Sequence, residues 1–569
     1  MKNKKILAIP AGVLAIALAA TIAANIGGAA TPATPAIQYT PAYQAIQEVI
    51  QEVIQEEAPP LTLDFSTREP FHTRALSIDI TASHPGATIF YTTDGSWPTT
   101  ESRVFNNTLS FNPRGGTRSE VVRAKAVYNG QVSETITQTY FIGQQINHRF
   151  DTLIFSISAD PEGLFSHETG IFVPGILREE FVRANPGRNI IPTDPANFNI
   201  RGMEGERHAY VEVFDQAGER IFTQAAGIRV HGGWSRAEPQ KSIRVIARHM
   251  YSPGDGQFHF DFFPWEMASD GSPIFRYDTL ILRNGGNDRA HGMLRHEVGS
   301  ILARNGGFTA VSPVRPVAVF VNGAYYGFAW LQVRFNEQYI ENLFNTPTRN
   351  IDVVGMGENW FDTDDAQIIA DLHYKNSYAH KDLLDDDIFA DLNAIVDIEN
   401  LMFYYAFQIY LGNNDWPHNN MRRWRYTGPE LGLTPETDGR WRYIIFDLDQ
   451  TFGLFGTDYT NPTFYRVIAS QNPASPLLRN ILTRPDMAAQ FIQIMEYIAH
   501  EVVTLENVTQ VVNYLVATGG NEMQQAITHG LYPSWFNFGF AQYHHQQIID
   551  FANHRPRQIF ADMNAFFGN

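Results

Sequence analysis

The 569-residue sequence contains no cysteine, which excludes disulfides, thiolate zinc sites and cysteine nucleophiles together. It also lacks an excess of positive charge, since 42 Lys and Arg stand against 60 Asp and Glu, a formal net charge of −18. Non-specific nucleic-acid binding needs a basic surface to displace counterions, so we expect no nucleic-acid partner. Stability must come from packing, for which 44% hydrophobic and 13% aromatic residues are sufficient. A chain of this length is expected to form several domain-sized units.

The N-terminus has the layout of a secretory signal. A basic flank, Met1 to Lys5, precedes an apolar, Ala-rich run that ends in small residues at Ala30. Removal of residues 1–30 is the favoured interpretation. An uncleaved membrane anchor is the alternative, because the run approaches the about 20 residues that span a bilayer. We therefore expect a secreted or cell-surface protein, with any membrane contact limited to this segment. Residues 31–60 are rich in Pro, Ala and Thr, which indicates a linker with a short helical segment.

Residues 61–143 are predicted to form a small antiparallel β-sandwich, because short alternating segments are separated by turn residues such as Asn129-Gly130. The expected strands are 76–80, 88–92, 121–128 and 135–140. The stretch Ala87–Thr99 resembles the immunoglobulin-like module in the C-terminal part of chitobiase and β-hexosaminidase-type enzymes, which implies an accessory module. Tyr91 and Trp97 are candidates for stacking on a carbohydrate, although packing within the module is the favoured role.

Two polar stretches in the last third of the chain are candidates for one phosphoryl-transfer site. In the first, Asp415 is followed five residues later by Asn420, and the second is an apolar strand that ends in Asp447 and Asp449. The period of two along a strand places both of these aspartates on one face, where both can approach one cation. Protein kinases use a catalytic-loop Asp, an Asn five positions later and a downstream Asp for metal binding and proton transfer. The offset alone is weak evidence, because Asp and Asn are common in turns.

The region from residue 147 to 569 is predicted to change from strands to helices along the chain. Strands are expected at 150–158, 210–215 and 226–231, with a hairpin near 170–173. Helical periodicity predicts helices at 291–305, 398–410, 476–482, 487–501, 508–516 and 541–564. The acidic runs Asp362–Asp365 and Asp382–Asp387 lack the spacing of a calcium loop and are interpreted as solvated turns.

Five ordered blocks of this region resemble the spore-coat CotH protein-kinase family over roughly residues 150–560. They are Val230–Arg236 with Pro239–Arg244, Leu282–Asp288, Val321–Gly327, Asn413–Asn420 and Asp447–Gly453. The resemblance implies a divergent kinase-like α+β domain at 147–569, with a β-rich N-lobe and a mostly α-helical C-lobe. It also implies a secreted protein serine/threonine kinase that transfers the γ-phosphate of ATP to extracellular, coat or surface proteins.

The resemblance implies two groups of site residues. One group would act at the γ-phosphate: Asp415 as catalytic base, and Asn419, Asn420 and Asp447 or Asp449 as ligands of Mg²⁺ or Mn²⁺. The sequence does not decide which strand-end aspartate is the main ligand. The other group would bind the nucleotide: Lys241 at the phosphates, Glu297 as its helix-borne partner, and Arg283. The turn after Arg283 has backbone amides that either face phosphate or only close the chain.

One position departs from the family pattern. Where the family commonly has Glu in the strand after the Asn-Gly turn, the sequence reads Leu331-Gln332-Val333-Arg334, with Val333 at that position. Loss of this carboxylate favours the alternative function, a catalytically impaired surface or adhesion protein with a glycan- or protein-binding sandwich. Retention of the Asp and Asn motifs favours the active kinase. A glycoside hydrolase is disfavoured, because the module that the sandwich resembles lacks the two opposed catalytic acids of those enzymes.

Overall fold

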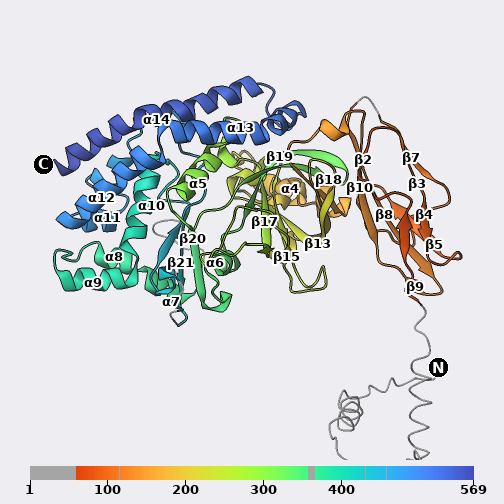
Figure 1. Cartoon of the computed structure of the whole chain (residues 1–569), viewed down its shortest axis with the longest axis horizontal. Coiled ribbons are helices and arrows are strands. Elements are labelled where there is room, and N and C mark those ends of the chain that lie inside the picture. Colours follow the sequence, from red (N-terminus) through yellow and green to blue (C-terminus); the bar gives the residue numbers. More distant parts are fainter. Residues whose placement is uncertain are drawn as a thin grey trace, which may run out of the picture. The chain divides into compact units, whose positions relative to one another are not determined.

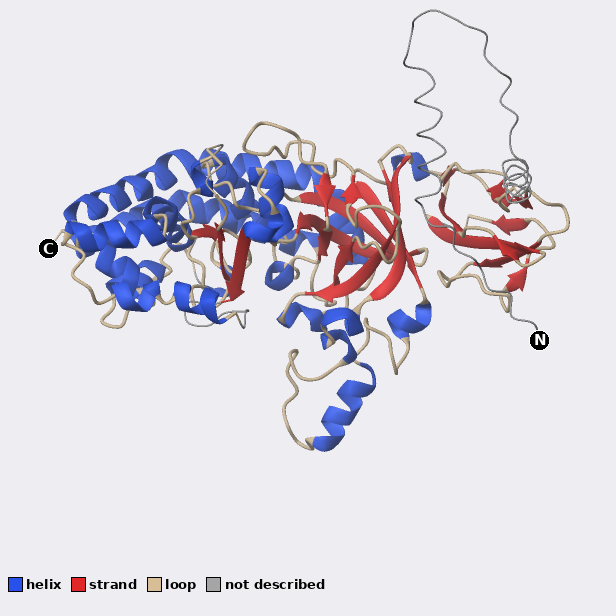
Figure 2. Cartoon of the chain, turned by 90° about the horizontal axis from the view of Figure 1, so that it is seen from below, coloured by secondary structure: helices blue, strands red, loops and turns tan. Residues whose placement is uncertain are grey.

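The computed structural model describes residues 59–113, 116–356, 365–429, 431–432, 434–456 and 458–568. The predicted signal or anchor segment and the helical segment of the linker lie outside these residues. Within them, a β-rich first part is followed by a helical last part, as the sequence predicts (Figures 1 and 2). Among the described helices, none combines the length and apolar character that crossing a membrane requires.

The first part of the chain is a β-sandwich of short strands. Their bounds are β1 Leu63–Phe65, β2 Phe71–His72, β3 Leu76–Ile78, β4 Ile80–Ala82, β5 Thr88–Thr92, β6 Arg103–Val104, β7 Leu109–Phe111, β8 Arg118–Tyr128, β9 Gln131–Val132 and β10 Ile136–Ile142. One sheet has the order β2-β10-β8-β5-β6, with β9 paired to β8, and β1-β4 and β3-β7 form two separate ladders. Buried side chains from the sheet and both ladders share one core, which includes Leu63, Ile78 and Val122.

The strands of the next region close into a seven-stranded barrel. Their bounds are β11 Leu153–Ala159, β12 Arg207–Phe214, β13 Arg220–His231, β14 Ser242–Ile246, β17 Thr279–Arg283, β18 Arg315–Val321 and β19 Ala324–Val333. The order around the barrel is β11-β12-β13-β14-β17-β19-β18, and parallel pairing of β11 with β18 closes it. A closed barrel was not predicted, because this pairing joins segments far apart in the sequence and leaves no local pattern. The barrel does not by itself establish the expected kinase-like lobes.

Between β11 and β12 the chain forms short helices, so the predicted hairpin at 170–173 is wrong. These are α3 Pro161–Phe165 and α4 Gly175–Ala184. The Asp160 carboxylate caps α3 by accepting a hydrogen bond from the Glu162 backbone N–H, and Pro161 occupies the first helical position. An Asp-Pro pair of this kind is a helix-start signal, and it outweighs the short alternation that follows it.

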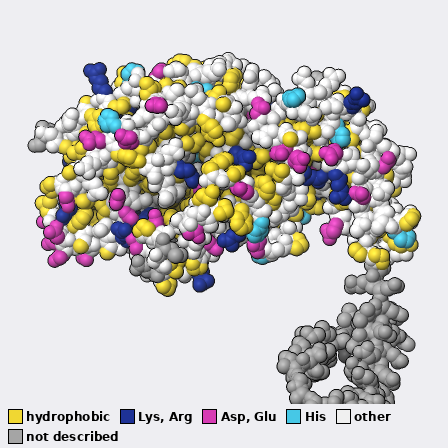
Figure 3. All heavy atoms as spheres, in the orientation of Figure 1, with side chains coloured by type: hydrophobic (Ala, Val, Ile, Leu, Met, Phe, Trp, Pro, Cys, Tyr) yellow, Lys and Arg dark blue, Asp and Glu magenta, His cyan; other side chains and the backbone are white. Residues whose placement is uncertain are grey.

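The last part of the chain is mostly helical. The helices are α5 Arg295–Asn305, α6 Glu337–Phe344, α7 Ala366–Leu372, α8 Tyr374–Tyr378, α9 Asp386–Ile395, α10 Ile398–Tyr410, α11 Pro476–Ile481, α12 Pro485–Tyr497, α13 Leu505–Thr528 and α14 Phe538–Phe567. A small antiparallel sheet of β20 Ile351–Met356, β21 Met421–Tyr426 and β22 Arg442–Ile444 lies among them. Acidic side chains gather at the edge formed by α9, where exposed Asp385 caps the helix (Figure 3). The predicted solvated role therefore fits Asp382–Asp387, whereas residues 362–364 lie outside the described part.

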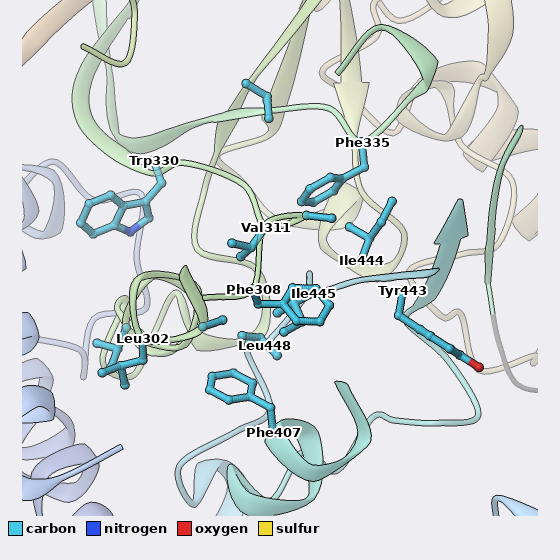
Figure 4. Packing of buried hydrophobic residues seen from close by; sticks show 14 of the residues in the cluster. Leu302, Phe308, Val311, Trp330, Phe335, Phe407, Tyr443, Ile444, Ile445 and Leu448 are labelled. Carbon is cyan, nitrogen blue, oxygen red and sulfur yellow. The ribbon is translucent and has the colours of Figure 1, made fainter. Parts of the chain in front are cut away.

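One continuous apolar core joins the barrel to the helices. Leu302 of α5 and Phe407 of α10 lie close to Ile445 and Leu448, which follow β22 (Figure 4). Each of these four side chains is fully buried. Close packing of this kind holds the segment after β22 in one position. Both strand-end aspartates, Asp447 and Asp449, are therefore carried on a rigid support.

Side-chain contacts also join the sandwich to the barrel. Trp97 stacks on the His208 ring of β12 with centroids 4.4 Å apart, and the Arg123 guanidinium lies 3.5 Å from the Trp97 ring centroid. Buried Glu212 of β12 accepts hydrogen bonds from the backbone N–H and the hydroxyl of Thr139. The Tyr91 ring packs edge-on against Phe105. Trp97 and Tyr91 thus both pack within the protein, as the packing interpretation expects.

Candidate active site

The two polar stretches predicted from the sequence meet after the end of β22. Backbone hydrogen bonds tie them together, from Asn414 N–H to the Gln450 carbonyl at 3.1 Å and from Phe452 N–H to the Leu411 carbonyl at 3.0 Å. The α10 helix delivers the first stretch and the buried segment after β22 delivers the second. The loop that carries Asp415 and the segment after β22 that carries Asp447 are therefore held side by side.

The Asp415 carboxylate is oriented by two amides of its own loop. The Asn419 side-chain amide donates to Oδ1 at 3.0 Å, and that of Asn420 donates to Oδ2 at 2.9 Å. Because the amide nitrogens are used in this way, their carbonyl oxygens remain available as ligands. The Asp415 side chain is 26% exposed, so a substrate hydroxyl can reach it. This geometry suits Asp415 as a base and both asparagines as neighbours of a cation.

The second acidic group shares one guanidinium. Arg283 Nη2, at the end of β17, donates to Asp447 Oδ1 at 2.8 Å and to Asp449 Oδ1 at 2.7 Å. Asp449 is buried and also accepts from the Asn287 backbone N–H at 2.8 Å, whereas the Asp447 side chain is 36% exposed. Asp449 is thus fully engaged within the protein. Asp447 keeps an exposed side that can bind a ligand.

Charge in this cluster is unbalanced toward the negative. Burial raises the pKa of Asp449 to about 7, against the opposing effect of Arg283, and burial together with the charge of Asp415 raises the pKa of Asp447. Burial opposes the charge of Arg283, but Asp449 and Asp447 hold its pKa above the ordinary value. Asp447 and Asp449 therefore share one guanidinium while Asp415 also acts on Asp447, and a divalent cation would relieve the repulsion among these carboxylates.

In the described ranges, no three His, Asp or Glu side chains are arranged to hold a metal ion by themselves. Magnesium in nucleotide sites commonly uses one or two carboxylates and completes its shell with water and phosphate oxygens. Asp447, with the amide oxygens of Asn419 and Asn420, provides a donor set of this type.

Two left-handed residues occur at this site. Asn420 has a φ of 59° and Asp447 has a φ of 52°. Residues other than glycine rarely adopt this left-handed backbone conformation. Such conformations cost on the order of 1–3 kcal/mol each and are concentrated at functional sites. The strain falls on two of the three residues that would hold the cation.

The outer face of the barrel next to this cluster is cationic. Strand alternation points Val230, Ile243 and Leu282 into the barrel and places their neighbours His231, Arg244 and Arg283 outside. Burial lowers the pKa of Arg244 to about 9, and the charge of Arg334 adds to this effect. Burial and the surrounding arginines, with Arg244 first, hold the pKa of His231 well below its usual range.

No acid in the described part of the chain forms an ion pair with Arg244 or Arg334. The buried Nε of Arg244 and Nη1 of Arg283 have no hydrogen-bond partner there either. Buried donors of this kind point to an anionic ligand. The sequence prediction did not include Arg244 and Arg334. Alternation alone would have indicated Arg244, which lies two residues after Ser242 and on the same face.

The structure pairs the predicted nucleotide residues differently from expectation. Lys241 Nζ donates to the Glu238 carbonyl at 2.6 Å and lies 4.4 Å from the centre of the Phe198 ring. Glu297 is buried near Arg283, and its Oε1 accepts from Gln332 at 3.3 Å. Lys241 lies just before β14, where the Glu238 carbonyl and the Phe198 ring hold its amine, so it does not pair with Glu297. Arg283 is the cation beside Glu297.

The structure also bears on two smaller predictions, which concern the turn after Arg283 and position 333. In the turn after Arg283, Gly286 N–H donates to Asn284 and Asn287 N–H donates to Asp449, so both amides are used within the protein. The Val333 side chain is buried in the barrel core beside Leu280, whereas Gln332 faces Glu297. Val in place of the family's usual Glu at position 333 therefore removes no charge from the outer face of the barrel.

Comparison with known families gives two matches. A model described as CotH kinase protein matches residues 228–559, a range that includes Asp415, Asp447, Asp449 and Arg283. A model described as Fn3 associated matches residues 78–140, within the sandwich, so a chitobiase-type module is not specifically supported. Among curated proteins, none matches the chain.

Proposed function

Because this chain belongs to the CotH kinase protein family, we propose that it is a protein kinase that transfers the γ-phosphate of ATP to Ser or Thr of secreted or surface proteins. The observation that carries this proposal is the juxtaposition of opposite charges. Asp447 binds Arg283 and is influenced by Asp415, whereas Arg244 and Arg334, which have no acidic partner in the described residues, lie on the barrel face beside it. A metal-bound polyphosphate needs acids for its cation and guanidinium groups for its phosphates.

Asp415 would accept the proton of the attacking hydroxyl. Its two oxygens are held by Asn419 and Asn420, so the base is positioned before substrate arrives. Bound Mg²⁺ or Mn²⁺ would neutralise the charge that develops on the phosphates. Arg244 and Arg334 would hold the remaining phosphate oxygens, and the buried Arg244 Nε, which has no hydrogen-bond partner in the described residues, supports this role.

We assign the main metal contact to Asp447 and a positioning role to Asp449. Asp449 is buried and already bonded to Arg283 and the Asn287 amide, so it keeps the turn after β17 against the strand end. Asp447 is half-exposed and is influenced by Asp415. Exposure and charge thus favour Asp447 where the sequence left the two residues equal.

Nucleotide binding by the purified protein tests the proposal. We expect ATP with Mg²⁺ or Mn²⁺ to raise the thermal unfolding temperature, because a ligand that binds only the folded state stabilises it. Arg244→Met and Arg334→Met should each weaken ATP binding at least tenfold in calorimetric titration, since each removes a charge-assisted hydrogen-bond donor. Arg74→Met, on the exposed surface of the sandwich, is the matched control. Absence of any stabilisation of the unmodified protein by ATP with either metal contradicts the proposal.

A further inference from the structure

A cavity lies at the N-terminal end of α10, at the opposite end of that helix from Asp415. Its volume is about 550 Å³, within the range of ligand-binding pockets. Residues after α5, the first turn of α10, the 3-10 turn Pro435–Thr437 and the last turns of α12 line it. We name it the α10 cavity. None of the site residues described above lines it.

The charge of the α10 cavity is negative after its internal ion pairs are counted. Asp397 and Asp438 pair with Arg440 and Arg442, and Arg442 Nη2 lies 2.9 Å from a carboxylate oxygen of each acid. Two acids and two arginines therefore balance. Glu399 and Glu436 also line the cavity, and neither has an ion-pair partner in the described residues.

The wall of the cavity is aromatic. Phe308 and Phe403 stack with ring centroids 5.7 Å apart, and Tyr497, which is 43% exposed, lies at the same cavity. A ligand that fits has cationic groups on apolar stems that can pack on these rings.

A peptide with Lys or Arg side chains has this combination. Its aliphatic stems pack on aromatic rings, and its cationic heads attract carboxylates and π faces. A polyamine has the charge but no planar guanidinium group to stack on the aromatic wall. The chemistry of the α10 cavity therefore favours a basic peptide over a small cation.

We propose that the α10 cavity docks a Lys- or Arg-bearing segment of the protein that the kinase phosphorylates. This rests on the proposed function, because it assigns the occupant as part of a phosphorylated substrate. The α10 helix has 13 residues, so at 1.5 Å per residue the cavity lies about 20 Å from the Asp415 loop. An extended segment covers that distance with about six residues. The docking segment is thus separated by about six residues or more from the phosphorylated Ser or Thr.

Peptide binding tests the docking independently of catalysis. The probe is a fluorescent peptide with four Lys and Arg residues and no Ser, Thr or Tyr, and anisotropy is measured without nucleotide. We expect the double substitution Glu399→Gln with Glu436→Gln to weaken binding about threefold to tenfold, since each exposed charge pair contributes modestly. Glu496→Gln, an exposed residue of α12 outside the cavity, should leave binding unchanged. Equal binding by the double variant and the unmodified protein overturns the proposal.

Two further arms identify the occupant. Tyr497→Leu keeps an apolar side chain and removes an exposed aromatic face of the wall, so it should weaken peptide binding at least twofold. Spermidine at the same charge concentration should compete poorly, and spermidine binding with no effect of Tyr497→Leu on the peptide overturns the peptide assignment. Phosphate transfer is then compared for two peptides, in which two or eight residues separate Ser from the basic segment. The peptide with eight residues should have the lower KM. Transfer without this spacing effect overturns docking alone, whereas basic-peptide binding without any transfer counts against the kinase activity.

Discussion

The turn after β17 gives the sharpest test of how the acidic cluster is held. Gly286 has a φ of 55°, and a Cβ built on it would lie 2.7 Å from Arg283 Nη2 and closer still to Asp449 Oδ2. Gly286→Ala therefore adds a methyl group where the ion pair sits. A left-handed alanine costs about 1 kcal/mol, and disruption of a buried ion pair adds about 3–5 kcal/mol. The expected loss of stability is about 4–6 kcal/mol.

Gly530→Ala separates strain from steric overlap. Gly530 also has a left-handed φ of 75°, but no heavy atom lies within 4 Å of a Cβ built there. This control should lose only the strain, about 1 kcal/mol. Calorimetry is the suitable assay, because a chain of several domains does not unfold in two states. At about 2 °C per kcal/mol, the midpoint should fall about 8–12 °C for Gly286→Ala and about 2 °C for Gly530→Ala. Equal shifts for the two variants refute the packing of Gly286 against the Arg283–Asp449 pair.

Two more predictions concern the contact between sandwich and barrel. Burial raises the pKa of Glu212 to about 7. Between about pH 4.5 and 7 the folded chain therefore holds a proton that the unfolded chain has released. As pH rises through this window, the free energy of unfolding falls by at most about 3 kcal/mol because of this group. Glu212→Gln cannot titrate, and its midpoint should fall less than that of the unmodified protein between pH 5 and pH 8; identical pH profiles contradict this. Trp97→Ala removes the stack on His208 and Arg123. The free energy of unfolding should fall by about 2–3 kcal/mol, which is less than the loss for a fully buried Trp. An unchanged calorimetric midpoint contradicts the stacking.

Local patterns predicted much of the secondary structure. The α10 helix spans Ile398–Tyr410 and β5 spans Thr88–Thr92, with the bounds expected from the sequence. The α13 helix was predicted too short, because Gly519-Gly520 interrupts its apolar period. A Cβ on Gly519 would lie 3.1 Å from the Pro316 side chain, so the bare glycine lets α13 pack closely on the barrel. Tertiary packing thus overrides a low helix propensity.

The candidate site was predictable only in part. The offset between Asp415 and Asn420 indicated the acid loop. Asp447 and Asp449 do lie together, but the prediction that strand alternation brings them together is wrong, because β22 ends at Ile444 and Asp447 has a left-handed φ of 52°. The ion pairs of Arg283 join residues more than 160 positions apart, at 2.8 and 2.7 Å, and no local pattern indicates them. The expected pair of Lys241 and Glu297 came from the family resemblance, whereas contacts with Glu238 and Phe198 hold the Lys241 amine elsewhere. Strand parity would have added Arg244, which lies within β14.

Phosphate transfer by Asp415→Asn is the most direct test of the central claim. Asn keeps the shape of the side chain and removes the carboxylate that would accept the hydroxyl proton. With ATP labelled in the γ-phosphate, Mg²⁺ or Mn²⁺ and a Ser-containing protein, we expect the unmodified protein to transfer label and the variant to lose at least 100-fold in rate. ATP binding should persist in the variant, because Arg244, Arg334 and Asp447 are unchanged. Equal transfer by both proteins, or no transfer by the unmodified protein, contradicts the proposed kinase activity.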